Sequence, residues 1–227
     1  QYNLDSFPKF YVSYLANITG VAYARDAATG TLRAQRERAA SQDQAPPARP
    51  VFDFGPSLQY RDQRVNDILF SSLPVSVSLG GVAILIALVL GLATGIIGAV
   101  KPGSWLDAST LTLSLIGISL PSFVVGTVLL MVFCVWLRVF PIGEWNPPLS
   151  MVLPAFTLSL PFAAYIARLS RMSMIEALSA DYIRTARAKG VSERGVVWRH
   201  GLRLGLLPVV SYLGPATAGL ISGSFVV

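Results

Sequence analysis

"LPVSVSLGGVAILIALVLGLATGIIGAV", residues 73–100, decides the fold class of this chain. It contains no charged side chain, and it is longer than the roughly 20 apolar residues that cross a bilayer as a helix. Three further stretches without charged residues lie at 108–137, 149–167 and 204–227. A backbone in lipid must satisfy its hydrogen bonds internally, which a helix does within one segment. We therefore predict an all-α membrane protein with four spans.

The composition agrees with a membrane protein. Hydrophobic residues make up 53% of the chain, charged residues make up 13%, and the mean hydropathy is +0.57. The net charge of +6 does not indicate a nucleic-acid-binding protein, because most cations lie between the apolar stretches rather than on a polar face with interleaved aromatic residues. The chain begins without Met and stops inside an apolar stretch, so we expect a fragment that lacks a first and a last span.

Basic residues assign the two sides of the membrane. If residues 1–72 lie outside, then 101–107 and 168–203 lie inside and 138–148 lies outside. The inside segments then carry one and eight basic residues, whereas the short outside loop carries one. Lys and Arg in short loops favour the cytoplasmic side, while long segments cross the membrane largely regardless of charge. We therefore predict that 1–72 is extracytoplasmic and that 101–107 and 168–203 are cytoplasmic.

The N-terminal segment, residues 1–72, differs from the rest in composition. Its portion 23–50 is rich in Ala, Arg, Gln and Pro and has very few large apolar residues. Such a composition buries too little surface to offset the entropy lost on ordering. We expect a disordered insertion at about 20–50, with a short helix allowed around 32–40. Residues 73–227 are expected to form the transmembrane domain.

Small residues recur four positions apart in the first and the last apolar stretch. They are Ala87, Gly91 and Gly95 in the first, and Pro215, Gly219 and Gly223 in the last. Faces of small residues let membrane helices approach one another closely. We expect both faces to pack against other helices, in this chain or in a partner.

Prolines lie within or at the edges of the apolar stretches, at positions 74, 121, 154, 161, 208 and 215. Each removes a backbone donor and tends to kink a helix, although neighbouring groups make this tolerable in membranes. For 117–126 two interpretations stay open, an ordinary membrane helix and a helix broken beside a pathway. The candidate path residues are polar or aromatic and lie at or near a proline: Ser119, Pro121, Ser122, Phe123 and Tyr165.

The apolar stretches lack the groups that many chemistries need. They hold no Asp, Glu, Lys, Arg or His side chain, which makes ion-coupled transport less favoured. The chain has no P-loop sequence, and its lone His200 has no other ligand at metal spacing. We therefore expect no catalytic residue, no metal site and no cofactor.

The cytoplasmic segment 168–203 has a folding pattern of its own. One helical stripe is predicted through Met172, Ile175, Ser179, Tyr182 and Ala186. The helix should end near Gly190, a suitable residue for the left-handed position after a helix. Ser192 can then cap a second helix, with Glu193 in its first turn.

This helix–glycine–helix pattern has two interpretations. The cations could attract anionic lipid headgroups, or the segment could dock a cytoplasmic protein. Attraction to lipid requires only charge, whereas the capped helices with an apolar face indicate a defined shape. The pattern therefore favours the docking interpretation.

Several short sequences resemble those of binding-protein-dependent ABC importer permeases, in particular the B-type subunit of the oligopeptide/dipeptide branch. They include "RTARAKG" at 184–190, "RHGLRLGLLP" at 199–208, "DFGPS" at 53–57, "PSFVV" at 121–125 and "PAFTLSL" at 154–160. The matches run in order from about 51 to 227. In the broad family the loop begins Glu-Ala-Ala, whereas this chain has Arg184, Thr185 and Ala186, the variant of the peptide branch.

The resemblance implies a type I ABC importer permease bundle with a cytoplasmic coupling helix. It implies a non-enzymatic subunit of a bacterial inner-membrane importer, with ATP hydrolysis in partner subunits. The expected partners are a second permease subunit forming a heterodimer, two cytoplasmic ATPase subunits and an extracytoplasmic peptide-binding protein. The residues expected to couple to the ATPase are Ile183, Arg184, Thr185, Ala186, Arg187, Ala188, Lys189, Gly190 and Val191.

Two other functions stay open at this point. An ion-coupled secondary transporter or channel would work without an ATPase. A membrane scaffold would use the basic loop only to hold lipid or an assembly partner.

Overall fold

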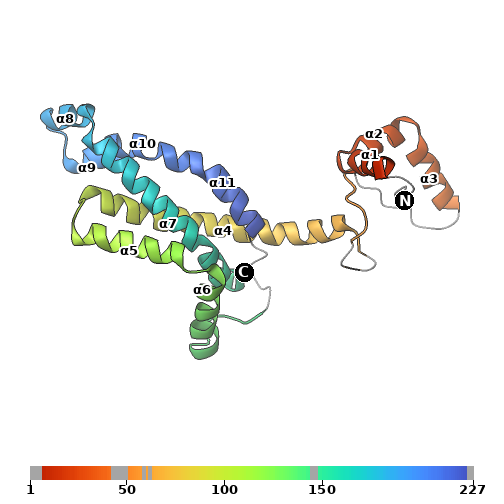
Figure 1. The fold of residues 1–227 in the computed structure, drawn as a ribbon, viewed down its shortest axis with the longest axis horizontal. Coiled ribbons are helices and arrows are strands. Elements are labelled where there is room, and N and C mark those ends of the chain that lie inside the picture. Colours follow the sequence, from red (N-terminus) through yellow and green to blue (C-terminus); the bar gives the residue numbers. More distant parts are fainter. Residues whose placement is uncertain (1–6, 42–50, 58–59, 61–62, 144–147, 224–227) are drawn as a thin grey trace. The chain divides into compact units, whose positions relative to one another are not determined.

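The computed structural model describes residues 7–41, 51–57, 60, 63–143 and 148–223, and Figure 1 gives their fold. The regular secondary structure of these residues is helical, apart from an isolated antiparallel bridge between Pro56 and Arg64. The chain divides into two compact units, Gln1–Pro74 and Val75–Val227. The first unit is small, and the second contains most of the apolar helices.

The first unit begins with three short helices, α1 (Phe7–Ile18), α2 (Val21–Ala28) and α3 (Thr31–Ser41). The expectation of disorder over 20–50 does not describe α2 and α3, and residues 42–50 lie outside the described residues. Ala, Arg, Gln and Glu are strong helix formers, so these segments become helical without a large apolar face. The short helix expected around 32–40 corresponds to α3.

A hydrogen-bonded turn precedes the first long helix, α4 (Val65–Val100). The buried side chain of Asn66 accepts a hydrogen bond from the backbone N–H of Phe54 at 2.9 Å and donates one to the carbonyl of Phe52. The backbone at Gly55 is left-handed, with φ of 84°. The "DFGPS" sequence therefore folds back on the first turn of α4 and fixes where that helix begins.

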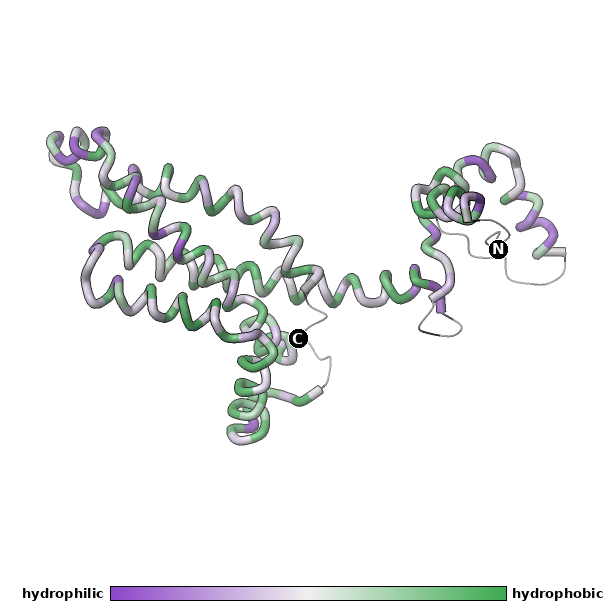
Figure 2. Tube along the Cα trace, in the orientation of Figure 1, coloured by the Kyte–Doolittle hydropathy of each residue, from purple (hydrophilic) through white to green (hydrophobic). Residues whose placement is uncertain are grey.

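The second unit holds the rest of α4 and the helices that follow. They are α5 (Trp105–Ser119), α6 (Ser122–Leu129), the π-helical η1 (Leu130–Trp136), α7 (Leu149–Ser179), α8 (Asp181–Ala188), α9 (Glu193–Gly195), the π-helical η2 (Val196–Gly201), α10 (Leu202–Gly205) and α11 (Leu207–Gly223). Figure 2 shows hydrophobic residues along α4 to α7 and hydrophilic residues gathered at α8 and α9.

Helices α4 and α7 are each long and apolar enough to cross a membrane. Two bent pairs pass the same test together, Trp105–Ser119 with Ser122–Trp136 and Glu193–Gly205 with Leu207–Ser222. The described residues thus hold up to four candidate spans if each bent pair is one span, in agreement with the predicted number. The bends are 100° and 50°, so two of the four expected helices are not continuous.

The sharper bend lies at Pro121. Leu120 is extended, with φ of −85° and ψ of 127°, and α6 starts directly after the proline. A residue before proline disfavours the helical conformation, which accounts for the end of α5. The prolines inside α4, α7 and α11 do not end those helices. The break predicted for 117–126 is confirmed, whereas its place beside a pathway stays a prediction.

Close packing around α7 forms the core of the second unit. A Cβ atom added at Gly91 of α4 would lie 2.7 Å from the carbonyl oxygen of Ala163 and from the side chain of Ile166, and one at Gly95 would collide with Ser170. On α11, a Cβ at Gly219 would lie 3.3 Å from Phe162. Both small-residue faces therefore pack against another helix, as predicted, and that helix is α7. The surroundings of Gly223 lie outside what the structure describes.

We expect Gly95→Ala to destabilise the protein by about 1–3 kcal/mol, because the added methyl group has no space between α4 and α7. Gly81 is a matched control, since it lies on the same helix with no atom within 4 Å of the added Cβ. Gly81→Ala should leave the melting temperature in detergent unchanged or raise it, since alanine is the better helix former. Equal melting temperatures of the two variants would contradict the packing.

Candidate functional site

The predicted cytoplasmic segment contains a break that the sequence did not reveal. Helix α7 ends at Ser179, Ala180 is extended with ψ of 152°, and α8 begins at Asp181. The single stripe predicted from Met172 to Ala186 is therefore wrong. Asp181 in the first turn of α8 is favoured there by the helix dipole, which supports a new helix start at this point.

The end of α8 agrees with the prediction at Gly190. This glycine is left-handed, with φ of 79°. Its N–H donates to the carbonyl of Arg187 at 2.9 Å, and the N–H of Val191 donates to the carbonyl of Ala186 at 3.2 Å. These two bonds form a Schellman motif. No atom lies within 4 Å of an added Cβ, so glycine is favoured here by backbone conformation rather than by space.

The predicted cap of the second helix is also present. Ser192 is extended, and its hydroxyl accepts a hydrogen bond from the N–H of Gly195 at 3.4 Å. The short α9 continues directly into η2 and α10. The loop is therefore a compact helix–turn–helix that leads into α11.

The two faces of α8 differ in burial. Ile183 is 0% exposed and Ala186 is buried, as are Val196 and Val197 of η2. The opposite side presents exposed residues: Arg184, Thr185, Arg187, Ala188, Lys189 and Gly190. Val191 is half-buried. The structure thus joins α8 to η2 through apolar contacts and leaves its cations outside.

An ion pair spans the Gly190 turn. The guanidinium of Arg187 donates two hydrogen bonds to the carboxylate of Glu193, at 2.8 and 3.2 Å. These bonds raise the pKa of Arg187 above its ordinary value. The sequence offered a signal, namely opposite charges on either side of a glycine turn, but only the turn geometry makes the two groups meet.

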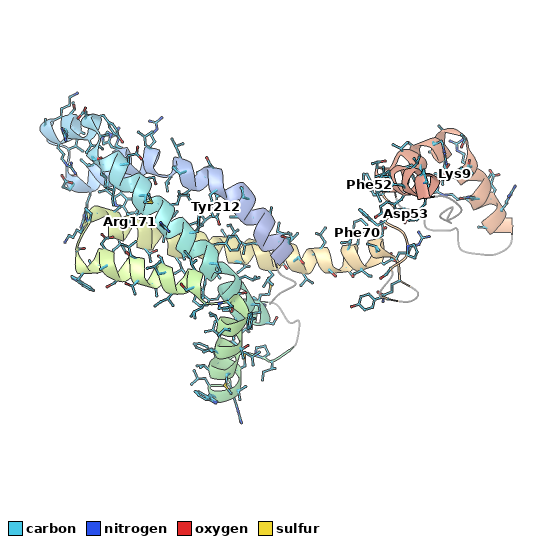
Figure 3. The ribbon with its side chains drawn as sticks, in the orientation of Figure 1. Lys9, Phe52, Asp53, Phe70, Arg171 and Tyr212 are labelled. Atoms are coloured by element: carbon cyan, nitrogen blue, oxygen red, sulfur yellow. The ribbon has the colours of Figure 1, made fainter. Side chains whose placement is uncertain are left out.

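A second ion pair was missed because its partners are far apart in the chain. The guanidinium of Arg171 on α7 donates to both carboxylate oxygens of Asp107 on α5, at 2.5 and 2.7 Å. The N–H of Gly103 donates to the same carboxylate at 2.8 Å. Asp107 is 3% exposed. Figure 3 labels Arg171 on the helix that leads to α8.

The candidate path residues do not form one group. Phe123 lines a cavity of about 580 Å³ between α4, α6, η1, residues 140–143 and the start of α7. Ser119 and Pro121 are exposed, and Ser122 is half-buried. Tyr165 instead packs on Tyr212 of α11, labelled in Figure 3, with ring centroids 4.4 Å apart.

No group of three His, Cys, Asp or Glu side chains within the described residues could hold a metal ion. The candidate site therefore comprises the helix–turn–helix loop, the ion pair on α7 and the broken helix.

Comparison with known proteins gives one family match and several relatives, all of them membrane components of transport systems. Residues 87–227 match the family model "Binding-protein-dependent transport system inner membrane component". The oligopeptide transport system permease proteins OppB of Salmonella typhimurium and Escherichia coli are 46% and 47% identical over 177 residues, or 77% of this chain. The dipeptide transport system permease protein DppB of Bacillus subtilis is 45% identical over 78% of it. The chain spans 58% of the length of each of these relatives.

The turn at Gly190 yields a prediction about local stability. Gly190→Ala should loosen the turn because a β-carbon disfavours the left-handed conformation by about 1–2 kcal/mol. Amide exchange of Gly190's neighbours, measured by hydrogen–deuterium exchange, should then rise about ten-fold. Gly190→Asn is the matched control, since asparagine tolerates this conformation, and its exchange should stay closer to wild type. The same exchange in both variants would mean that φ at this position is not the constraint.

Proposed function

Because this chain belongs to the binding-protein-dependent transport system inner membrane components, we propose that it is a permease subunit of an ATP-driven importer of peptides. It forms half of the translocation path in a bacterial inner membrane. The names of its relatives support peptides as the substrate class. The observation that carries the proposal is the compact loop around Gly190, with apolar residues turned into the chain and cations turned out.

The proposed assembly has four kinds of component. A second permease subunit completes the path as a heterodimer, two cytoplasmic ATPase subunits hydrolyse ATP, and an extracytoplasmic binding protein delivers the peptide. This chain then contributes no catalysis of its own. Residues 1–72 face the extracytoplasmic side, 73–227 form the permease domain, and 101–107 and 168–203 face the cytoplasm, because the basic residues of the short segments favour that orientation.

The loop residues take two different roles in this proposal. Arg184 and Lys189 are exposed and contact the ATPase subunit. Ile183 and Ala186 are buried against η2, so they anchor α8 to its own chain instead of filling a groove on the partner. Force applied to α8 is then carried into the helices on both sides of the loop. ATP binding and the loaded binding protein bias the resulting two-state movement.

Arg187 has a role between docking to the ATPase and anchoring α8. Its two hydrogen bonds to Glu193 support the turn, and its side chain is still 43% exposed. We propose that Arg187 stabilises the shape of the exposed side of α8, which docks to the ATPase. Thr185 likewise donates its hydroxyl to the carbonyl of Asp181 at 3.1 Å, so its polar group is occupied within α8.

The translocation path is proposed to pass the broken helix. Phe123 and the cavity it lines support this assignment, since wet or ligand-binding cavities in membrane proteins are where irregular backbone is tolerated. Ser119, Pro121 and Ser122 lie at the break itself. Tyr165 is assigned to a different face because of its contact with Tyr212.

Charge reversal at one position separates docking from simple attraction to lipid. Arg184→Glu should reduce the amount of ATPase that co-purifies with the assembled transporter in mild detergent by at least several-fold, because a repulsive charge enters the interface. Arg199→Glu is the matched control, since it makes the same charge change at an exposed residue of η2 and should retain the ATPase.

The other outcomes discriminate between functions. Full retention of the ATPase in Arg184→Glu would overturn docking through α8. An equal loss in both variants, together with equally weaker binding to anionic vesicles, would support the scaffold whose loop is held only by charge.

A further inference from the structure

A short segment of α7 connects the helices around it. Ser170 lies against Gly95 of α4, and Arg171 binds Asp107 of α5. The hydroxyl of Ser173 donates to the carbonyl of Gly205 in α10. Met174 packs so closely on Gly205 that an added Cβ would lie 2.5 Å from its sulfur. Segment 170–174 is therefore held by α4, α5 and α10 at once.

The ion pair is the most directional of these contacts. Both oxygens of the Asp107 carboxylate are engaged by Arg171, and such bidentate pairs fix orientation as well as distance. A Cβ at Gly98 of α4 would lie 3.0 Å from the carboxylate and 3.4 Å from Arg171 Cδ. The absence of a side chain at Gly98 leaves room for the pair, and the close backbone limits its movement.

The start of α5 is built to hold the carboxylate in place. The hydroxyl of Ser104 caps this helix and accepts the N–H of Asp107 at 3.3 Å. The N–H of Gly103 donates to the carboxylate itself. The negative charge also lies in the first turn of α5, where the helix dipole favours it. Asp107 is therefore fixed relative to the axis of α5, and the pair fixes that axis to α7.

The pair lies between the two moving parts of the proposed cycle. From Arg171, α7 runs uninterrupted to Ser179, and α8 follows after Ala180. From Asp107, α5 runs uninterrupted to Ser119 at the break. A displacement of α8 that is passed on at Ala180 can thus reach the break through α7, the ion pair and α5.

We propose that Asp107 and Arg171 form the joint that passes movement of the coupling loop to the broken helix at Pro121. They are positioning residues, and this inference rests on the proposed function. The pair keeps α5 and α7 moving as one body during the transport cycle. Without it, α8 still binds the ATPase, but its movement is no longer transmitted in full to α6.

Neutral substitutions test the joint in the assembled transporter. Asp107→Asn leaves the half-buried charge of Arg171 without its partner, and Arg171→Gln does the same to the buried charge of Asp107, so each single change destabilises the protein. The double variant removes both charges, so it should recover much of the melting temperature lost by the single variants. Its stimulation of ATP hydrolysis by the peptide-loaded binding protein should still fall at least about five-fold, the lower end of usual coupling effects.

Two controls separate this inference from the proposed function. Arg168→Gln removes a cation one turn earlier on α7, where the side chain is exposed, and should leave stimulation unchanged. The double variant should still co-purify with the ATPase. Loss of co-purification would overturn the joint, because the pair would then be needed for docking itself. Failure of Arg184→Glu to release the ATPase would instead overturn the docking on which the joint rests. Normal stimulation in a stable double variant would also overturn the joint.

A distance measurement tests the rigid-body claim directly. Spin labels at exposed Ser109 of α5 and Met172 of α7, in a Cys134→Ser background, report the separation of the two helices. Double electron–electron resonance spectroscopy should give the same label-to-label distance in the nucleotide-free and the ATP-trapped transporter. In the double variant, the distribution of this distance should be broader. A distance that changes with nucleotide in the protein with its native ion pair would contradict the proposal.

Discussion

The close approach of α4 to α7 is the constraint on which the second unit depends. Lipid removes most of the hydrophobic driving force between helices, so association relies on dense packing and on polar contacts. Gly91 and Gly95 remove the side chains that would hold the two backbones apart. That approach also brings Gly98 beside Asp107 and Arg171. The glycines of α4 thus leave room both for its packing against α7 and for the ion pair beside Gly98.

In the proposed assembly, the two faces of the loop after α7 have different roles. Buried Ile183 and Ala186 make α8 part of the chain's own structure, while the exposed cations are available to a partner. A docking element that was held only by its partner would move without moving the membrane helices. Anchoring α8 to η2, and α10 to α7 through Ser173 and Met174, links the loop to the spans on both sides of it.

Local rules account for what could be predicted from the sequence. The uncharged stretches, the left-handed Gly190, the cap at Ser192 and the kinking effect of Pro121 depend on neighbouring residues alone. The end of α7 at Ala180 was missed because the apolar spacing continues through it without a glycine or proline. Helix α2 was missed because helix propensity does not require a core. The pair of Asp107 and Arg171 depends on how two distant helices pack, which no local pattern encodes.

The ion pair of Asp107 and Arg171 also restricts how the sequence can change. Substitution of either Asp107 or Arg171 alone leaves one uncompensated charge in a site with little room, as the contacts at Gly98 indicate. Replacing both together removes that penalty, but it requires two coincident changes at positions far apart in the gene. If the two residues are replaced one after the other, the protein with only the first replacement is less stable than either the starting or the final protein. The residues at positions 107 and 171 are therefore expected to change together during evolution.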